Sequence, residues 1–293
     1  MLAIDDVLNL VRLKVEVYHN ARVCGNWQIR EHSLDASCFH MPTQGGCLLQ
    51  VPGEGDWRLS EGDVVIFPKE LPHTMEPCET LEGPQQHLAI DQSQEVEGTS
   101  MLCGSIHFQH QGGAQLLQLL PNVLIIRAET ARQWLEPVKQ LIVAESVSGV
   151  EMSSPLLNRL CELLVAYSIR CYAANIEHDS GILALYSHPK LFKAVEAIHR
   201  NPQAPWQLAS LAKEAGMSRT RFSQLFSAIG GMTATYYLSW WRMQLAWTEL
   251  QQGQSVEAVA ELVGYRSEAA FSRAFKKQFG WTVGEVRAGK ISG

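Results

Sequence analysis

The pattern of apolar and polar positions divides the chain into a strand-like first part and a helical second part. From Val15 to about Ile126, short β-prone runs are separated by turn residues. Such runs at this spacing are typical of an all-β sandwich or barrel. The predicted strands are Val15–Tyr18, Cys24–Ile29, Ala36–His40, Cys47–Val51, Trp57–Leu59, Asp63–Phe67 and Met101–Gln109.

In two longer segments after these runs, Thr130–Ser146 and Ser154–Asn175, apolar residues recur at helical spacing. Ser154 is a good N-cap for the second segment, and Pro155 suits its first helical position. This segment also carries an apolar stripe, which packs either on the preceding barrel or on another copy of the chain. The stripe consists of Leu156, Leu160, Leu163, Leu164, Tyr167 and Cys171.

Near the C-terminus one apolar pattern occurs twice, as Leu208–Phe226 and again as Val256–Phe275. In each copy, a glycine, Gly216 or Gly264, separates two helical stretches. Glycine permits the positive φ that stops one helix sharply and lets the next helix cross it. The repeat therefore predicts two helix-turn-helix units.

The second helix of each unit has one inward and one outward face. Ser218 and Ser267 are good N-caps for these two helices. Phenylalanines spaced four residues apart face inward: Phe222, Phe226, Phe271 and Phe275. The outward positions remain free to contact base edges in a DNA major groove, where such helices dock.

The segment between the two units, Thr233–Gly253, has no helix breaker before its last residue. About 19 helical residues at roughly 1.5 Å each give on the order of 29 Å. This length is near the roughly 34 Å repeat of B-DNA. One rigid helix would therefore hold two recognition helices in successive major grooves.

The C-terminal segment Pro205–Arg287 resembles the AraC/XylS-type transcription regulators. The matching residues are Pro205-Trp206, Ala215-Gly216-Met217-Ser218, Tyr237-Leu238, Trp241-Arg242-Met243, Val263-Gly264-Tyr265, Ala270–Phe275 and Phe279-Gly280. The family usually has proline where this chain has Ala234 and Val283. The resemblance implies binding to double-stranded promoter DNA, contact with RNA polymerase, and a homodimer that pairs through the apolar stripe.

The family's contact pattern implies two sets of DNA-contacting side chains. Base edges would be read by Arg219, Thr220, Ser223 and Gln224 in the first unit, and by Glu268, Ala269, Ser272 and Arg273 in the second. Phosphates would be contacted by Arg221, Arg266, Lys276 and Lys277. Base contacts specify sequence, whereas phosphate contacts only position the protein. For any one of these side chains taken alone, the alternative is a solvated surface charge.

Charge is distributed unevenly along the chain, whose net charge is −6. From Pro189 onward there are 13 Lys and Arg against 7 Asp and Glu, while residues 1–188 hold 11 against 23. A basic module thus follows an acidic one. Because phosphate binding needs only a local positive face, this distribution favours DNA over a purely protein-binding helical bundle.

The segment Gly62–His73 resembles the second motif of cupin barrels, with Glu70 where glycine is usual. Metal-dependent cupins also use two histidines in an H-x-H pair followed by a glutamate. Here Phe39-His40-Met41 supplies one histidine, and no glutamate lies between His40 and Gly45. We therefore expect no catalytic residues, no enzyme activity and no required cofactor. A non-catalytic metal site using His40, His73, Cys103 or His107 stays open, as does, more remotely, a cupin metalloenzyme fused to a DNA-binding module.

The seven cysteines lack a C-x-x-C pair, and this odd count suggests a reducing cytosol rather than a disulfide framework. The segments Val23–Trp27 and Leu102–Phe108 resemble a cupin subgroup of this family that includes reactive-chlorine-responsive activators. That resemblance implies that oxidation of Cys24 and Cys103 changes the sensor domain. A cysteine near histidines reacts readily with oxidants, and on a strand Cys103 and His107 share one face.

Two alternatives to oxidant sensing remain at this stage. Each cysteine would also suit a small buried apolar position, which is common for a free thiol. Cupin barrels also suit a small organic effector, held here by His40 and His73.

The predicted fold is α+β: a cupin-type barrel with C-terminal helices, followed by an all-α tandem helix-turn-helix domain. We expect a sensor and dimerisation domain over 1–176, a linker over 177–188 and a DNA-binding domain over 189–293. The start of the chain lacks a basic, apolar signal pattern, and no stretch reaches about 18 apolar residues. We therefore expect a cytoplasmic protein that does not contact membranes.

Overall fold

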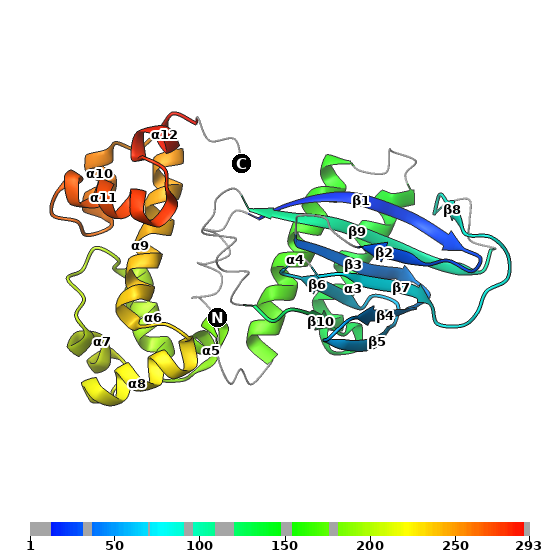
Figure 1. Cartoon of the computed structure of the whole chain (residues 1–293), viewed down its shortest axis with the longest axis horizontal. Helices are drawn as coiled ribbons and strands as arrows, with labels where there is room; N and C mark the ends of the chain where they lie inside the picture. The colour runs from blue at the N-terminus through cyan, green and yellow to red at the C-terminus, as the bar shows by residue number, and fades with distance from the viewer. Residues whose placement is uncertain are drawn as a thin grey trace. The chain divides into compact units, whose positions relative to one another are not determined.

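The computed structural model describes residues 13–31, 37–69, 71–90, 96–108, 120–147, 154–175 and 181–289. The chain forms two compact units, one made of residues 13–107 and 120–172 and the other including the chain from residue 173 onward. The described strands and two long helices belong to the first unit, while the second unit is helical (Figure 1). This is the α+β architecture that the sequence predicts.

The strands of the first unit form two sheets. Their bounds are β1 (Leu13–Cys24), β2 (Ile29–Glu31), β3 (Ser37–Gln44), β4 (Cys47–Val51), β5 (Gly55–Leu59), β6 (Val64–Phe67), β7 (His73–Pro77), β8 (Gln86–Leu88), β9 (Gly98–Phe108) and β10 (Leu124–Ile126). The larger sheet has the order β10-β6-β3-β9-β1-β8 and the smaller has the order β2-β7-β4-β5. The strand expected at Cys24–Ile29 is instead largely a turn, in which Gly25 adopts a φ of 73°.

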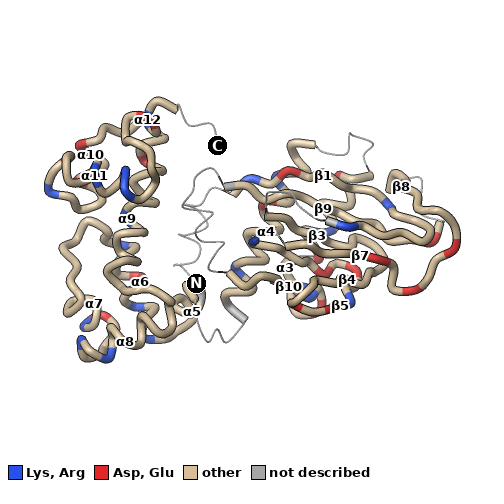
Figure 2. Tube along the Cα trace, in the orientation of Figure 1, with Lys and Arg blue, Asp and Glu red and all other residues tan. Residues whose placement is uncertain are grey.

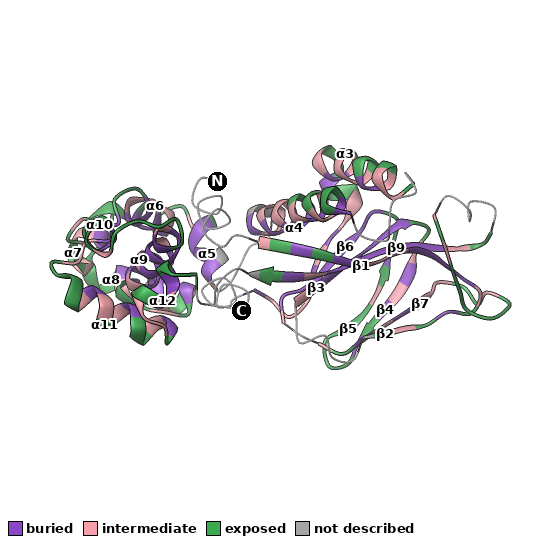
Figure 3. Ribbon diagram, turned by 90° about the horizontal axis from the view of Figure 1, so that it is seen from above, coloured by how far each residue is buried: buried purple, intermediate pink, exposed green. Residues whose placement is uncertain are grey.

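The core of the barrel lies between the two sheets, because alternate residues of a strand point to the same side. Residues of both sheets meet there, including Cys38, Val65, Phe67, Cys103, Leu49 and Met75. The opposite face of the larger sheet is covered by two helices, α3 (Ala128–Val147) and α4 (Pro155–Asn175) (Figure 3). Phe39 and Met41, which alternate with the inward residues of β3, are therefore fully buried as well.

Helices α3 and α4 confirm the two helices predicted after the barrel. The carboxylate of Asp63 accepts hydrogen bonds from Arg127 Nη1 at 2.7 Å and from the Ala128 backbone N–H at 2.8 Å, and so holds the start of α3. Ser154 Oγ accepts a hydrogen bond from the Leu157 backbone N–H at 3.0 Å, which confirms the predicted N-cap of α4. None of the helices in the described ranges is long and apolar enough to cross a membrane.

The second unit contains the two predicted helix-turn-helix pairs, α7 with α8 and α10 with α11, joined by α9. The helices are α5 (Ile182–Ser187), α6 (Leu191–Arg200), α7 (Leu208–Glu214), α8 (Arg219–Gly230), α9 (Ala234–Gln251), α10 (Val256–Leu262), α11 (Glu268–Phe279) and α12 (Val283–Arg287). Gly216 and Gly264 have φ values of 62° and 77°. Both turns therefore have the positive φ that the sequence predicts at these glycines.

Helix α5 lies within residues 177–188, where a linker was expected. Ile182 and Leu185 are buried, and the Gly181 backbone N–H donates to Ile229 O of α8 at 2.5 Å. A hydrogen bond and buried apolar side chains hold this segment on α8. The part from Gly181 onward is therefore packed structure of the helical unit.

Candidate nucleic-acid interface and sensor core

The second helix of each helix-turn-helix pair is capped and oriented as the sequence predicts. Ser218 Oγ accepts from the Arg221 backbone N–H at 3.4 Å, and Ser267 Oγ accepts from the Ala270 backbone N–H at 3.3 Å. The inward phenylalanines Phe222, Phe226, Phe271 and Phe275 are fully buried. Since one face of each helix is fixed in the core, the opposite face points to solvent.

The side chains expected to contact DNA lie on that outward face and beside it. Ser223 and Ser272 are half-buried, and the others are exposed: Arg219, Thr220, Arg221, Gln224, Arg266, Glu268, Ala269, Arg273, Lys276 and Lys277. Across the described ranges, no ion pair involves the basic members of this set. Lys and Arg accordingly mark α8 and α11 in Figure 2. Their positive charge is available to a polyanion.

Helix α9 and one arginine fix the two pairs relative to each other. The 18 residues of α9 span about 27 Å at roughly 1.5 Å per residue. Arg242 of α9 donates to Pro202 O at 2.7 Å and to Ala204 O at 2.8 Å, in the loop before α7. A Cβ added at Gly264 would lie 2.6 Å from Gln203 O of the same loop. The turn of the second pair therefore packs tightly against the entrance of the first.

The two departures from the family's usual prolines are structurally accommodated. Ala234 and Val283 occupy the first helical positions of α9 and α12. Proline suits that position because its missing N–H has no intrahelical partner there. Thr233 and Thr282 cap these helices, and Glu285 completes a capping box with Thr282. Side-chain caps thus begin both helices without proline.

A buried polar network in the helical unit was not predicted from the sequence. Tyr237 Oη of α9 lies 2.7 Å from both Tyr186 Oη of α5 and His199 Nε2 of α6. The ring of His199 stacks on Trp241, with ring centroids 3.5 Å apart. These contacts join three helices through α9.

Within the barrel, the structure brings together His40 of β3 and His73 of β7, two of the predicted sensor residues. Their Nε2 atoms are 2.8 Å apart. Cys38, which the sequence did not single out, places Sγ 3.6 Å from His40 Nε2. The ligand atoms of these three buried side chains all lie within 4.8 Å of one another. Cys38 and His40 are two residues apart on one strand, so their side chains point to the same side. This spacing is the sequence signal that could have indicated the cluster.

Burial disfavours the charged form of both histidines in this cluster. Burial lowers the pKa of His40 well below its ordinary value, and burial also lowers the pKa of His73. His73 Nδ1 lies 2.7 Å from Leu71 O, and a carbonyl only accepts, so Nδ1 carries the hydrogen. Phe67 stacks on the His73 ring with centroids 4.1 Å apart. The His73 Nε2 lone pair therefore faces His40.

The other predicted sensor residues lie at different places on β9. Cys103 is buried and pairs directly opposite His40 in the β3–β9 register. His107 is exposed, and its Nε2 lies 2.7 Å from Ser105 Oγ. It follows Ile106, which pairs with Ser37 at the start of β3. The structure therefore does not bring His107 to the histidine cluster, because β9 continues beyond its partner strand.

Cys24 is buried at the end of β1, far from Cys103. A Cβ added at Gly98 would lie 2.9 Å from Cys24 Sγ, so Cys24 lies beside the start of β9. Cys103 follows five residues later, a separation of roughly 16 Å along a strand. A disulfide needs Cα atoms about 4.4–6.8 Å apart. The two thiols therefore cannot be joined without a rearrangement of β9.

The apolar stripe of α4 is divided between two environments. Leu164 is fully buried, whereas Leu156 and Leu163 are 56% and 51% exposed. Leu160 and Tyr167 are half-buried. Part of the stripe thus packs on its own barrel while the rest faces outward.

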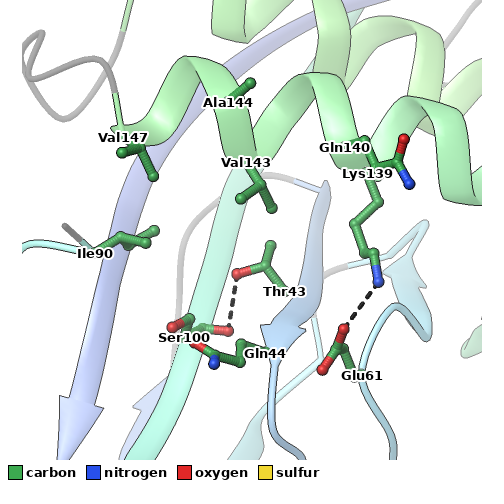
Figure 4. A pocket seen from close by; sticks show the side chains of 10 residues that line it. All are labelled: Thr43, Gln44, Glu61, Ile90, Ser100, Lys139, Gln140, Val143, Ala144 and Val147. Atoms are coloured by element: carbon green, nitrogen blue, oxygen red, sulfur yellow. Dashed lines mark hydrogen bonds and ion pairs between the residues drawn. The ribbon is translucent and has the colours of Figure 1, made fainter. Parts of the chain in front are cut away.

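A pocket of about 450 Å³ lies between α3 and the larger sheet (Figure 4). Thr43, Gln44 and Ser100 line it from the sheet and Val143 lines it from α3. At one end Lys139 Nζ forms an ion pair with Glu61 Oε1 at 2.9 Å. This pocket is separate from the histidine cluster, which lies between the two sheets.

Residues 3–174 match the family model described as Cupin, and residues 211–289 match one described as Helix-turn-helix domain. The chain is 28% identical to the RCS-specific HTH-type transcriptional activator RclR of Escherichia coli (strain K12), over 92% of this chain and 90% of that protein. It is 27% identical to the HTH-type transcriptional regulator AlkR of Acinetobacter baylyi, over 94% of this chain and 96% of that protein.

A crystal structure of an AraC-type transcriptional regulator from Chromobacterium violaceum covers 36% of this chain and 94% of its own, with 28% identity and a TM-score of 0.33. The cupin match spans more than half of the chain, and the helix-turn-helix match spans most of the first helix pair and all of the second. The chain therefore belongs to the AraC-type DNA-binding transcription regulators that carry an N-terminal cupin domain.

Proposed function

We propose that this protein is a dimeric transcription activator that senses an oxidant in its cupin unit and adjusts how its helix-turn-helix pairs engage promoter DNA and RNA polymerase. One observation carries the DNA-binding part. Two capped helices, α8 and α11, expose basic side chains that form no ion pair with other described residues, and one connecting helix fixes their faces. RclR, similar to this chain over most of its length, is named as an RCS-specific activator.

DNA reading would follow the division made from the family pattern. Base edges are assigned to Arg219, Thr220, Ser223 and Gln224 in α8, and to Glu268, Ala269, Ser272 and Arg273 in α11. Phosphates are assigned to Arg221, Arg266, Lys276 and Lys277. The roughly 27 Å length of α9 supports binding in successive major grooves, whose repeat is about 34 Å.

Oxidant sensing is assigned to Cys24 and Cys103. Hypochlorous acid carries a thiolate to a sulfenic acid, with chloride released, and the sulfenic acid condenses with a second thiol to form a disulfide and water. Since the two thiols lie roughly 16 Å apart along β9, this condensation requires β9 to shift. A polar sulfenic acid in an apolar core also disfavours the reduced packing. Either event shifts the population towards a second arrangement of the cupin unit.

The decisive experiment compares binding of reduced and hypochlorous-acid-treated protein to a promoter fragment from upstream of its own gene. We expect oxidation to change the affinity or the footprint of wild type, and to leave Cys24→Ser and Cys103→Ser unchanged. Cys161→Ser is the matched control, because Cys161 is a buried thiol of α4 whose pKa is raised to about 12 by burial. Identical binding by wild type in both redox states would sink oxidant sensing.

A second candidate signal is a small organic effector, and the pocket beneath α3 favours it. The pocket combines apolar side chains of α3 with the polar Thr43, Gln44 and Ser100 of the sheet. Val143→Trp would fill this pocket and should then abolish activation of transcription by the effector. Cys24→Ser should still respond to the effector. The opposite pattern would favour the thiols.

A further inference from the structure

The barrel interior contains three metal-ligating side chains for which DNA binding provides no role. Cys38 and His40 belong to β3 of the larger sheet, and His73 belongs to β7 of the smaller sheet. Their exposed fractions are 3%, 0% and 2%. The cluster thus joins the two sheets at a point from which bulk water is excluded.

The distances within the cluster are close to those around a tetrahedral zinc ion. Bonds of about 2.3 Å to sulfur and 2.0–2.1 Å to nitrogen place sulfur and nitrogen roughly 3.6 Å apart, and two nitrogens roughly 3.3 Å apart. Cys38 Sγ and His40 Nε2 are 3.6 Å apart, and the two Nε2 atoms are 2.8 Å apart. Binding would require the two rings to separate by about half an ångström, a small rotamer adjustment.

Neighbouring residues orient the His73 ring and leave His40 Nδ1 without a hydrogen-bond partner among the described residues. Leu71 O accepts from His73 Nδ1, so the Nε2 lone pair points into the cluster. In the 2.8 Å contact His40 Nε2 must then donate, which leaves His40 Nδ1 as an acceptor. That atom is buried with no hydrogen-bond partner among the described residues. For His40 Nε2 to bind a metal, this hydrogen has to move to Nδ1, after which the Nε2 lone pairs of both histidines face the ion.

We propose that Cys38, His40 and His73 bind a divalent ion of the zinc class. A thiolate with two neutral imidazoles suits zinc and disfavours magnesium or calcium, which prefer oxygen ligands. Cys103 pairs opposite His40 in the β3–β9 register and belongs to the same core. The proposal is independent of DNA binding, because the ligands lie within the N-terminal unit.

The test uses the full-length protein, freed of any affinity tag and of metal, titrated with Co²⁺. We expect thiolate-to-cobalt charge-transfer absorption that saturates at about one ion per protomer and is displaced by Zn²⁺. Cys38→Ser should remove this absorption, and His73→Gln should weaken binding more than about 100-fold, since losing a group that only orients a ligand already costs about 10- to 100-fold. Cys47→Ser, which removes a buried thiol of β4 outside the cluster, should bind like wild type.

Two results would overturn the proposal. One is wild type that shows no charge-transfer absorption with Co²⁺. The other is a Cys38→Ser variant that keeps the absorption and the one-to-one stoichiometry. If circular dichroism shows that His73→Gln is unfolded, the near-isosteric Cys38→Ser alone tests the metal site. Loss of promoter binding in a separate assay would count against the DNA-binding proposal alone.

Discussion

Arg273 and Lys276 of α11 are both exposed and outside the ion pairs of the described ranges, yet they are assigned different tasks. A guanidinium that pairs two-pronged with guanine contributes discrimination between bases. A lysine that contacts phosphate adds affinity on any sequence and increases the salt dependence. Single side chains therefore separate specificity from affinity.

Arg273→Ala should weaken promoter binding by about 1–3 kcal/mol and relax the preference for one base pair. Lys276→Ala should weaken binding on all sequences and reduce the salt slope by about one. Fluorescence anisotropy on matched and mutated fragments at several salt concentrations measures both. Arg200→Ala is the control, because Arg200 of α6 is ion-paired with Glu196 at 2.7 Å. Wild-type binding by Arg273→Ala would contradict the assignment.

His19 of β1 links stability to pH. Burial, together with repulsion from His87, lowers its pKa to about 4, below the roughly 6.5 expected when unfolded. Because the folded pKa is depressed, the unfolded chain binds the proton more readily between these values. Stability is therefore full above about pH 6.5 and is lost as the pH falls toward 4.

We expect the free energy of unfolding of wild type to fall between pH 7.5 and pH 5 by about 1–2 kcal/mol more than that of His19→Gln. Urea titrations at the two pH values measure the difference. An equal loss in both proteins would show that His19 is not its source.

At the scale of elements, the two helix-turn-helix turns differ in their surroundings. Gly216 and Gly264 both adopt positive φ. A Cβ at Gly216 would meet nothing within 4 Å, whereas one at Gly264 would lie 2.6 Å from Gln203 O and 2.9 Å from Arg242 Nη2. Only the second turn is therefore part of the contact between the two pairs.

Gly216→Ala should cost about 1 kcal/mol, because only the left-handed conformation is penalised. Gly264→Ala should cost at least about 2 kcal/mol more, because backbone must also move, and should weaken promoter binding. Thermal unfolding and anisotropy provide the two readouts. Equal effects of the two substitutions would mean that the contact with the loop before α7 does not hold the pairs in register.

At the scale of the whole molecule, exposed apolar residues of α3 and α4 bear on assembly. Leu141 and Val147 of α3 are 58% and 39% exposed, alongside Leu156 and Leu163 of α4. Single exposed leucines are common, but several on two helices that cover the same sheet would suit an interface. A second copy of the chain suits this face, since a two-fold interface pairs one patch with itself.

The double variant Leu156→Glu/Leu163→Glu should shift the protein from dimer to monomer in sedimentation experiments, because the patch would bring like charges together. Leu262→Glu is the control, as Leu262 is 41% exposed on α10 of the DNA-binding unit. A wild-type monomer at micromolar concentration, or a dimer that persists in the double variant, would contradict the interface.

The tandem helix-turn-helix units were determined by the sequence itself, because their signals are local. Gly216 and Gly264 end one helix, Ser218 and Ser267 begin the next, and phenylalanines four residues apart mark the buried face. Caps, positive φ and helical period act over a few residues, so each is readable in order along the chain. The family match and the charge distribution rest on the same local information.

Only the tertiary structure decided which distant residues meet. Cys38 and His40 belong to one sheet and His73 to the other, so their convergence depends on how the sheets stack. His107 shares a strand with Cys103 but extends past the pairing with β3. The packing of Gly264 against Gln203 likewise joins segments far apart in the chain. Register and sheet stacking are set by the sum of many weak contacts, which no local pattern encodes.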